Sequence, residues 1–240
     1  MHQPTLLINC DLGEGISNEA QIFPWIDVAS VACGGHFGDR ETISSTLRLA
    51  LEYGKKVGAH PSYPDRKNFG RLSMDLPPKD LIGSIKEQLC LFFEISKELQ
   101  IWPDHIKFHG ALYNDAVSNP LLAQILVEFL KSEYGAIPLF VPPCSVLEQV
   151  AMSQGLPIRR EVFGDRSYEK DYHLSSRALE NALFTRIEQV LPQVTAIVEK
   201  GILITRTGEP LPIQAETLCF HGDNPGILAF LPVVREKFWK

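Results

Sequence analysis

The feature that most constrains this chain is a regular alternation of short β-rich runs with longer segments of helical spacing. In the longer segments, apolar residues recur every three or four positions, a pattern that buries one face of a helix. Each β-rich run is followed by a helix or a long loop, an order typical of a parallel sheet covered by helices. The runs expected to form strands are residues 5–12, 28–34, 55–61, 105–110, 137–143, 158–163 and 217–222.

The helical segments carry recognisable start and stop signals. The segment 39–54 opens at Asp39, a suitable N-cap, and closes at Gly54, a residue type common just beyond a helix. Pro192 is expected to interrupt the longest segment, because proline removes a backbone donor. The other expected helices lie within residues 77–100, 119–135, 175–201 and 224–238.

A parallel sheet of this length either closes into a barrel or stays open and doubly wound. No glycine-rich turn follows the first expected strand, as a dinucleotide-binding open sheet requires. The phosphate-binding patterns GxxxxGKS and GxxxxGKT do not occur in the sequence either. Internal repeats and low-complexity linkers are not evident, so we expect residues 1–240 to form one domain.

Charge and cysteine content narrow the class of protein. The formal charge is −6, with acids and bases mixed along the chain and no basic patch, which argues against a nucleic-acid partner. The five cysteines are odd in number, form no CxxC motif and mostly lie in apolar runs, as reduced cysteines do. No apolar run is long enough for a membrane span, and the first residues are too short for a signal peptide. We therefore expect a cytoplasmic protein.

Polar side chains gather where the expected strands end. In a closed parallel barrel, the C-terminal strand ends are where active sites lie. Burying ionisable groups costs several kcal/mol each unless they are paired or liganded. Their coincidence at six of the seven expected strands therefore indicates function. These residues are Asn9, Asp11, Glu14, His36, His60, Arg71, Lys107, His109, Glu161, Asp165, Arg166, His221 and Asp223.

Single members of this set have simpler explanations. A lone histidine in a strand is more often a hydrogen-bonded core residue than a catalyst. Asp39 and Asp223 can serve only as helix N-caps, and Lys107 can be a structural ion-pair partner of Glu161.

Two chemistries suit these residues. In one, an aspartate and several histidines hold a divalent metal that activates water, with Asp11, His36, His60 and His109 as the ligands. In the other, no metal is bound: Lys107 with Arg71 or Arg166 binds a carboxylate or phosphate, while acids and imidazoles move protons. We favour the second, because these cations would repel a metal.

Taken together, the motifs resemble the LamB/YcsF family, known as the A subunit of 5-oxoprolinase. They occur in the family's order and extend over almost the whole chain. Gly35, Phe37, Ser62 and Phe108 depart from the family's usual residues, whereas the charged positions are retained. The motifs are NCDLGE (9–14), ACGGHFGD (32–39), GAHPSYPD (58–65), FGR (69–71), KFHGALYN (107–114), FGDRSY (163–168) and FHGDNP (220–225).

The resemblance implies an irregular TIM-like β/α barrel, similar to those of polysaccharide deacetylases and some glycosidases. It implies ATP-dependent hydrolysis of the lactam 5-oxoproline to glutamate, together with two partner subunits, B and C. ATP, with Mg²⁺ as its counter-ion, can phosphorylate the lactam carbonyl oxygen, after which water attacks the carbon. Nucleotide handling would be shared with the partners or use an unrecognised site. A protein-bound metal and a homodimer stay open.

Carried onto this sequence, the resemblance implies specific roles. Asp11 or His109 would act as general base on water, and Lys107 and Arg71 would hold the substrate carboxylate or an oxyanion. His60 and His221 would orient groups or donate a proton. The expected catalytic residues are Asp11, Glu14, His60, Lys107, His109 and Glu161. The expected substrate-binding residues are Asn9, His36, Arg71, Asp165, Arg166, His221 and Asp223.

Two other functions stay open at this point. One is a metal-dependent carbohydrate deacetylase or related hydrolase that acts alone. The other is a non-catalytic subunit whose pocket binds a ligand and regulates a partner enzyme.

Overall fold

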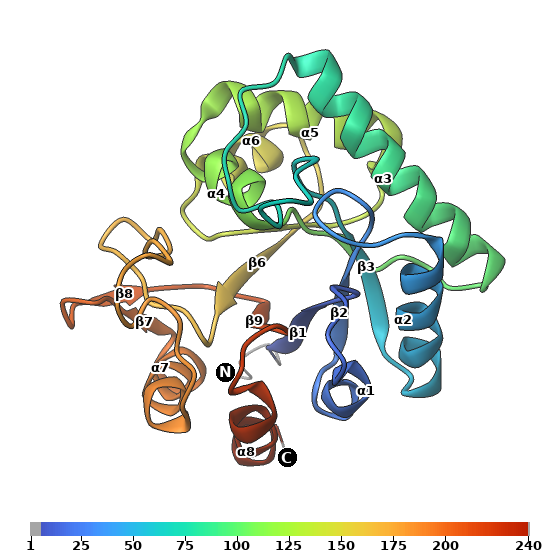
Figure 1. Ribbon diagram of the computed structural model, residues 1–240. Coiled ribbons are helices and arrows are strands. Elements are labelled where there is room, and N and C mark those ends of the chain that lie inside the picture. Colours follow the sequence, from blue (N-terminus) through green and yellow to red (C-terminus); the bar gives the residue numbers. More distant parts are fainter. Residues whose placement is uncertain (1–5, 240) are drawn as a thin grey trace.

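In the computed structural model, which describes residues 6–239, seven parallel strands close into a barrel surrounded by helices (Figure 1). Strands adjacent in sequence pair in order from β1 to β6, and β9 closes the ring between β6 and β1. The strands are β1 (Leu7–Leu12), β2 (Val28–Ala32), β3 (Lys56–His60), β4 (His105–Ile106), β5 (Leu139–Val141), β6 (Ile158–Phe163) and β9 (Thr217–His221). This confirms the expected TIM-like barrel and its seven strands. Residues 1–5 and 240 of the expected 1–240 domain, Thr5 of the first expected strand among them, lie outside the described part.

The helices lie around the outside of the ring (Figure 1). They are α1 (Glu19–Ile22), α2 (Arg40–Glu52), α3 (Pro78–Glu98), α4 (Gly110–Ser118), α5 (Pro120–Tyr134), α6 (Val146–Ser153), α7 (Ile187–Lys200) and α8 (Ile227–Phe238), with a 3-10 turn at Phe23–Trp25. Asp39 caps α2 as predicted, since its carboxylate accepts from Thr42 N at 2.9 Å. No helix within residues 6–239 combines the length and apolar character needed to cross a bilayer.

One expected helix was wrong over half its length. The helix predicted within 175–201 forms only from Ile187 to Lys200, and the predicted interruption at Pro192 was also wrong, because this proline lies inside the continuous helix. In the preceding segment, backbone groups make tertiary hydrogen bonds: Phe184 N donates to Asp165 O at 2.8 Å, and Ser175 N donates to Ser167 O at 3.0 Å. The sequence pattern also missed a hairpin formed by β7 (Ile202–Ile204) and β8 (Pro210–Pro212) beside the barrel.

Alternation along the barrel strands separates apolar from polar side chains. In β1, Ile8, Cys10 and Leu12 belong to the hydrophobic core, while Asn9 and Asp11 between them are also buried. Successive side chains of a strand point to opposite faces, so the apolar set packs under the helices and the polar set faces the barrel interior. The interior is therefore polar, and its groups must pair with one another.

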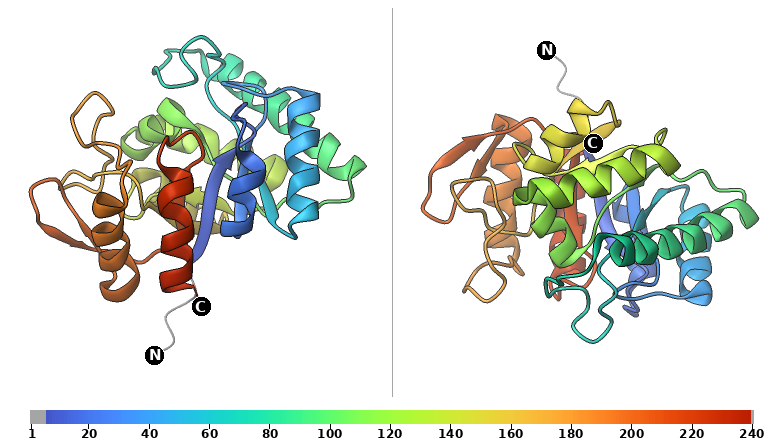
Figure 2. Two further views of the ribbon diagram at one scale, coloured as in Figure 1. Left: turned by 60° about the horizontal axis from the view of Figure 1, so that its bottom comes forward. Right: turned by 90° about the horizontal axis from the view of Figure 1, so that it is seen from above.

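The fourth strand is much shorter than predicted, yet its extension still lies against β3. Only His105 and Ile106 have strand geometry, but Lys107 N donates to Ala59 O at 2.9 Å and His109 N donates to Pro61 O at 2.9 Å. These bonds keep Lys107 and His109 at the C-terminal end of the barrel. The loop after β3 and the segment 165–186 extend beyond the barrel at this end (Figure 2, left).

Candidate active site

Side chains from the strand ends meet around one cavity at the C-terminal end of the barrel. Parallel register sets Asp11 directly opposite His221 on the neighbouring strand. The cavity has a volume of about 600 Å³. Of the residues expected at the site, Asp11, His60, Arg71, Lys107, His109, Glu161, Arg166 and His221 line it. The others, Asn9, Glu14, His36, Asp165 and Asp223, do not line the cavity and contact its lining residues from behind.

Lys107 is the centre of a buried charge network. Only 1% of it is exposed, and its Nζ lies 2.7 Å from Asp11 Oδ1 and 2.9 Å from Glu161 Oε1. Cys219 Sγ lies 3.0 Å from the same ammonium. Burial opposes the charge, but the two carboxylates hold the pKa of Lys107 well above its usual value. The ammonium is therefore fully occupied by its neighbours.

The two carboxylates respond differently to Lys107. Burial opposes the charge of Asp11, but Lys107 and His60 hold its pKa well below the usual range. Burial dominates at Glu161 and raises its pKa despite the ammonium. Lys107 therefore does pair with Glu161, as the simpler explanation predicted, and it pairs with Asp11 as well.

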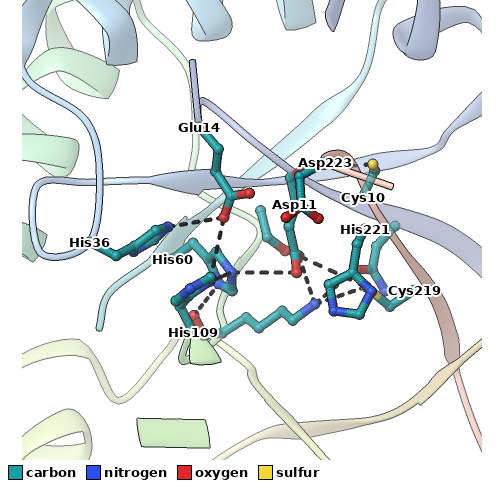
Figure 3. Close-up of polar contacts among 12 residues, drawn as sticks. Cys10, Asp11, Glu14, His36, His60, His109, Cys219, His221 and Asp223 are labelled. Atoms are coloured by element: carbon teal, nitrogen blue, oxygen red, sulfur yellow. Dashed lines mark hydrogen bonds and ion pairs between the residues drawn. The ribbon is translucent and has the colours of Figure 1, made fainter. Parts of the chain in front are cut away.

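A second group, the Glu14 cluster, consists of Glu14, His36, His60 and His109 (Figure 3). His36 Nε2 and His109 Nδ1 lie 3.0 and 3.4 Å from Glu14 Oε1, and His109 Nδ1 lies 3.0 Å from His60 Nε2. The rings of His36 and His109 stack with centroids 3.6 Å apart. Burial lowers the pKa of both His36 and His109 well below the usual value, which favours neutral imidazoles. Burial raises the pKa of Glu14.

A glycine contact holds one wall of this cluster. Gly110 has φ +57, and a Cβ added there would lie 2.5 Å from Gly70 O. Its lack of a side chain lets the start of α4 approach the loop after β3, where Ala111 N donates to Gly70 O at 2.9 Å. The approach brings Phe69 O within 2.9 Å of His109 Nε2.

His221 is oriented from behind by Asp165. Asp165 Oδ1 accepts from His221 Nδ1 at 3.0 Å, and its Oδ2 accepts from Asn224 Nδ2 at 2.9 Å. Burial opposes the charge of Asp165, but His221 and Asn224 hold its pKa below the usual value. Because Nδ1 carries the proton that binds Asp165, Nε2 of His221 is the nitrogen free to exchange a proton at the cavity.

The two arginines expected at the site differ in how freely they can bind a ligand. Arg71 pairs with Asp223, and its guanidinium lies 4.9 Å from the centre of the Phe69 ring. Arg166 is buried and donates to the carbonyls of Ala182 at 3.0 Å and Ser175 at 2.6 Å. Arg166 thus holds the segment 165–186 over the cavity, whereas Arg71 keeps a more exposed side chain.

Several cavity residues were not predicted as site residues. Tyr113 and Tyr168 are buried in the cavity wall, and Tyr168 Oη accepts from Phe163 N at 2.8 Å. Both lie in motifs that carry the family resemblance, so the motifs contained this signal. Tyr172, His173 and Arg177 also line the cavity; Tyr172 and His173 lie between the FGDRSY motif and the predicted helix, Arg177 lies inside that helix, and no site residue was predicted in this stretch.

Comparison with known proteins places this geometry in a family. The sequence model of the LamB/YcsF family matches residues 6–240. The chain belongs to the LamB/YcsF family. A crystal structure of a lactam utilization protein from Thermus thermophilus superposes with a TM-score of 0.88 at 30% identity, covering 97% of this chain and 96% of that one. The family 4 carbohydrate esterase from Streptomyces lividans, in complex with acetate, gives a TM-score of 0.44 at 13% identity, covering 96% of this chain and 85% of that one.

Proposed function

We propose that this LamB/YcsF protein is the A subunit of an ATP-dependent 5-oxoprolinase, which opens the lactam of 5-oxoproline to glutamate with partner subunits B and C. The observation that carries the proposal is its likeness to a lactam utilization protein along nearly the full length of both chains. The cavity supports it, because acids, imidazoles and cations surround a space large enough for a small cyclic amide.

The residues suggest a division of labour for hydrolysis. Arg71 is the cation best placed to bind the substrate carboxylate: it pairs with Asp223 but is 38% exposed, whereas Lys107 is buried between Asp11 and Glu161. His221, oriented by Asp165, takes a proton from attacking water or returns one to the lactam nitrogen. Ionised Asp11 orients the water beside them. We assign ATP with Mg²⁺ to the assembled complex, in which phosphorylation makes the lactam carbonyl a better electrophile.

The test is glutamate release from 5-oxoproline by this chain co-expressed with its candidate partners, with and without ATP. Omitting the chain or ATP is expected to abolish release. His221→Gln is expected to lower the rate by at least about 100-fold, the usual contribution of a general acid or base. His105→Gln is the matched control, because this buried imidazole binds Ser30 at 2.8 Å and does not line the cavity. Full ATP-dependent release without this chain would refute the proposal and support a regulatory role.

A second candidate function is a metal-assisted amide or ester hydrolase that acts alone, such as a carbohydrate deacetylase. The specific observation in its favour is the Glu14 cluster. Hydrolysis of such substrates by the isolated chain without ATP would support it over the first proposal.

A further inference from the structure

The Glu14 cluster brings four potential metal ligands together, but the rings of His36 and His109 stack in parallel, so only one of these two imidazoles can point its lone pair at a given ion. One ligand atom from each of Glu14, His36, His60 and His109 lies within 4.8 Å of the other three, and all four residues are buried. Figure 3 shows dashed lines from His36 and His109 to the Glu14 carboxylate, with His60 between this group and Asp11. Two imidazoles and one carboxylate, with a further position open to water, are a donor set suited to first-row transition metals.

Two backbone carbonyls decide which ring nitrogens carry protons. His60 Nδ1 lies 2.8 Å from Lys107 O, and His109 Nε2 lies 2.9 Å from Phe69 O. A carbonyl oxygen can only accept, so both of these nitrogens must donate. In the neutral rings, His60 Nε2 and His109 Nδ1 are then both unprotonated.

These two unprotonated nitrogens face each other at 3.0 Å, where two acceptors repel. The Glu14 carboxylate, which when ionised also only accepts, lies 3.4 Å from the same His109 nitrogen. Glu14 can accept from His36 Nε2, 3.0 Å away, but the facing nitrogens of His60 and His109 have no donor between them unless one of the two rings takes up a further proton. A cation held among them would satisfy all three together.

We propose that Glu14, His60 and His109 bind one divalent first-row transition-metal ion, while His36 donates to the Glu14 carboxylate from outside the ligand set. Four ligands about 2.0–2.1 Å from a tetrahedral ion lie about 3.3 Å from one another. His109 Nδ1 lies 3.0 Å from His60 Nε2 and 3.4 Å from Glu14 Oε1, and both distances are close to this spacing. The carbonyls of Lys107 and Phe69 supply the outer hydrogen bonds that commonly orient metal-binding histidines.

The surrounding charges allow a cation at this position. From the sequence alone, Lys107 and the arginines are expected to repel a metal. Lys107 is instead matched by both Asp11 and Glu161, and Arg71 by Asp223. The carboxylate of Glu14 is not used in these pairs, and Lys107 has two carboxylates for one ammonium. The resulting excess of negative charge can balance the ion.

The geometry also selects Glu14 over Asp11 as the acidic ligand. Asp11 Oδ2 lies 3.5 Å from His60 Nε2, but its Oδ1 is held by Lys107 at 2.7 Å. Asp11 therefore lies beside the proposed ion on the cavity side. His60 and His109 line the cavity, so the ion would be reached from there. A metal in this place can activate water or polarise a carbonyl.

The test measures metal binding by the isolated full chain, without partners or substrate. Protein stripped with a chelator is titrated with Zn²⁺ and Co²⁺, and with Mg²⁺ as a hard cation that prefers oxygen ligands. We expect one Zn²⁺ or Co²⁺ per chain by elemental analysis, a visible Co²⁺ absorption band, and no comparable Mg²⁺ binding.

The variants separate the proposed ligands from their neighbours. Glu14→Gln and His109→Gln are expected to weaken Zn²⁺ binding by at least about 100-fold, since losing outer-shell partners alone costs about 10–100-fold. Asp11→Asn and the buried control His105→Gln are expected to retain one ion per chain. Circular dichroism checks folding, and Co²⁺ absorption monitors ligation in each folded variant.

Three results would overturn the proposal. One is a folded wild-type chain that binds neither Zn²⁺ nor Co²⁺, which would mean that a proton joins the imidazoles. Another is unchanged binding in both Glu14→Gln and His109→Gln. The third is binding that is lost in Asp11→Asn and kept in Glu14→Gln. None of these outcomes depends on whether the chain hydrolyses 5-oxoproline.

Discussion

Replacing Lys107 by methionine tests whether the barrel interior depends on its central cation. Lys107→Met keeps a long side chain but removes the ammonium that lies 2.7 Å from Asp11 and 2.9 Å from Glu161. At an effective dielectric constant of about 20, each contact represents about 6 kcal/mol of Coulomb attraction before desolvation is subtracted. Removing one partner of a buried network usually costs about 3–5 kcal/mol, because the remaining charges stay buried and uncompensated.

We expect Lys107→Met to lower the free energy of unfolding by about 3–5 kcal/mol near neutral pH. The loss should shrink in acid, because the orphaned carboxylates of the variant take up protons. In the wild type, the contributions of Lys107 and Asp11 stay constant over this range: the stabilisation from Lys107, with its raised pKa, is lost only as pH rises through that value. The stabilisation from Asp11, with its lowered pKa, is lost only as pH falls through its own.

The measurement is urea unfolding of wild type and variant at about pH 8 and about pH 5, followed by circular dichroism. Lys86→Met is the matched control, because Lys86 pairs with Glu133 at 3.0 Å on the surface and should lose less than about 1 kcal/mol. Lys107→Met/Glu161→Gln should recover part of the loss. A loss as small as that of Lys86→Met, with an unchanged denaturant slope, would refute the reasoning.

Three further predictions concern separate parts of the molecule. Burial lowers the pKa of His105 to about 4, so the free energy of unfolding should fall as pH decreases from about 6.5 to about 4. In His105→Gln, the slope of this fall should be smaller by about 1.4 kcal/mol per pH unit. Parallel denaturant series test this, and equal slopes would contradict it. Gly83 is exposed inside α3, and an added Cβ meets nothing within 4 Å. Gly83→Ala should therefore raise the free energy of unfolding in urea by about 0.5–1 kcal/mol. A less stable variant would show that α3 does not tolerate a side chain at this position. Arg71→Met should raise KM for 5-oxoproline about tenfold in the assembled enzyme with kcat nearly unchanged, whereas a fall in kcat alone would exclude a binding role.

Local pattern was enough to predict the barrel strands and the polar residues at their ends. Two-residue alternation in β1 places Asn9 and Asp11 on one face whatever the rest of the chain does. Asp39 caps its helix through a contact only three residues away. Such features depend on neighbours within a turn or a strand, so the sequence alone determines them.

The pattern failed where the backbone made long-range bonds. Helical spacing continues through residues 175–186, but Arg166 binds the carbonyls of Ser175 and Ala182 and draws this segment over the cavity. Only two residues of the fourth strand have strand geometry, although the residues that follow them still bind the backbone of β3 and the residue just after it. In both places, tertiary hydrogen bonds replaced local ones, and these bonds cannot be predicted from local secondary-structure propensity.

The chain's residue types and spacing thus determined a parallel β/α ring with ionisable groups at its strand ends. Only the closed tertiary structure decided their partners: Lys107 with two carboxylates, His221 with Asp165, and Glu14 with three imidazoles. The physical reason is that alternation settles which face a side chain takes, whereas register and barrel closure settle which distant side chain it meets there.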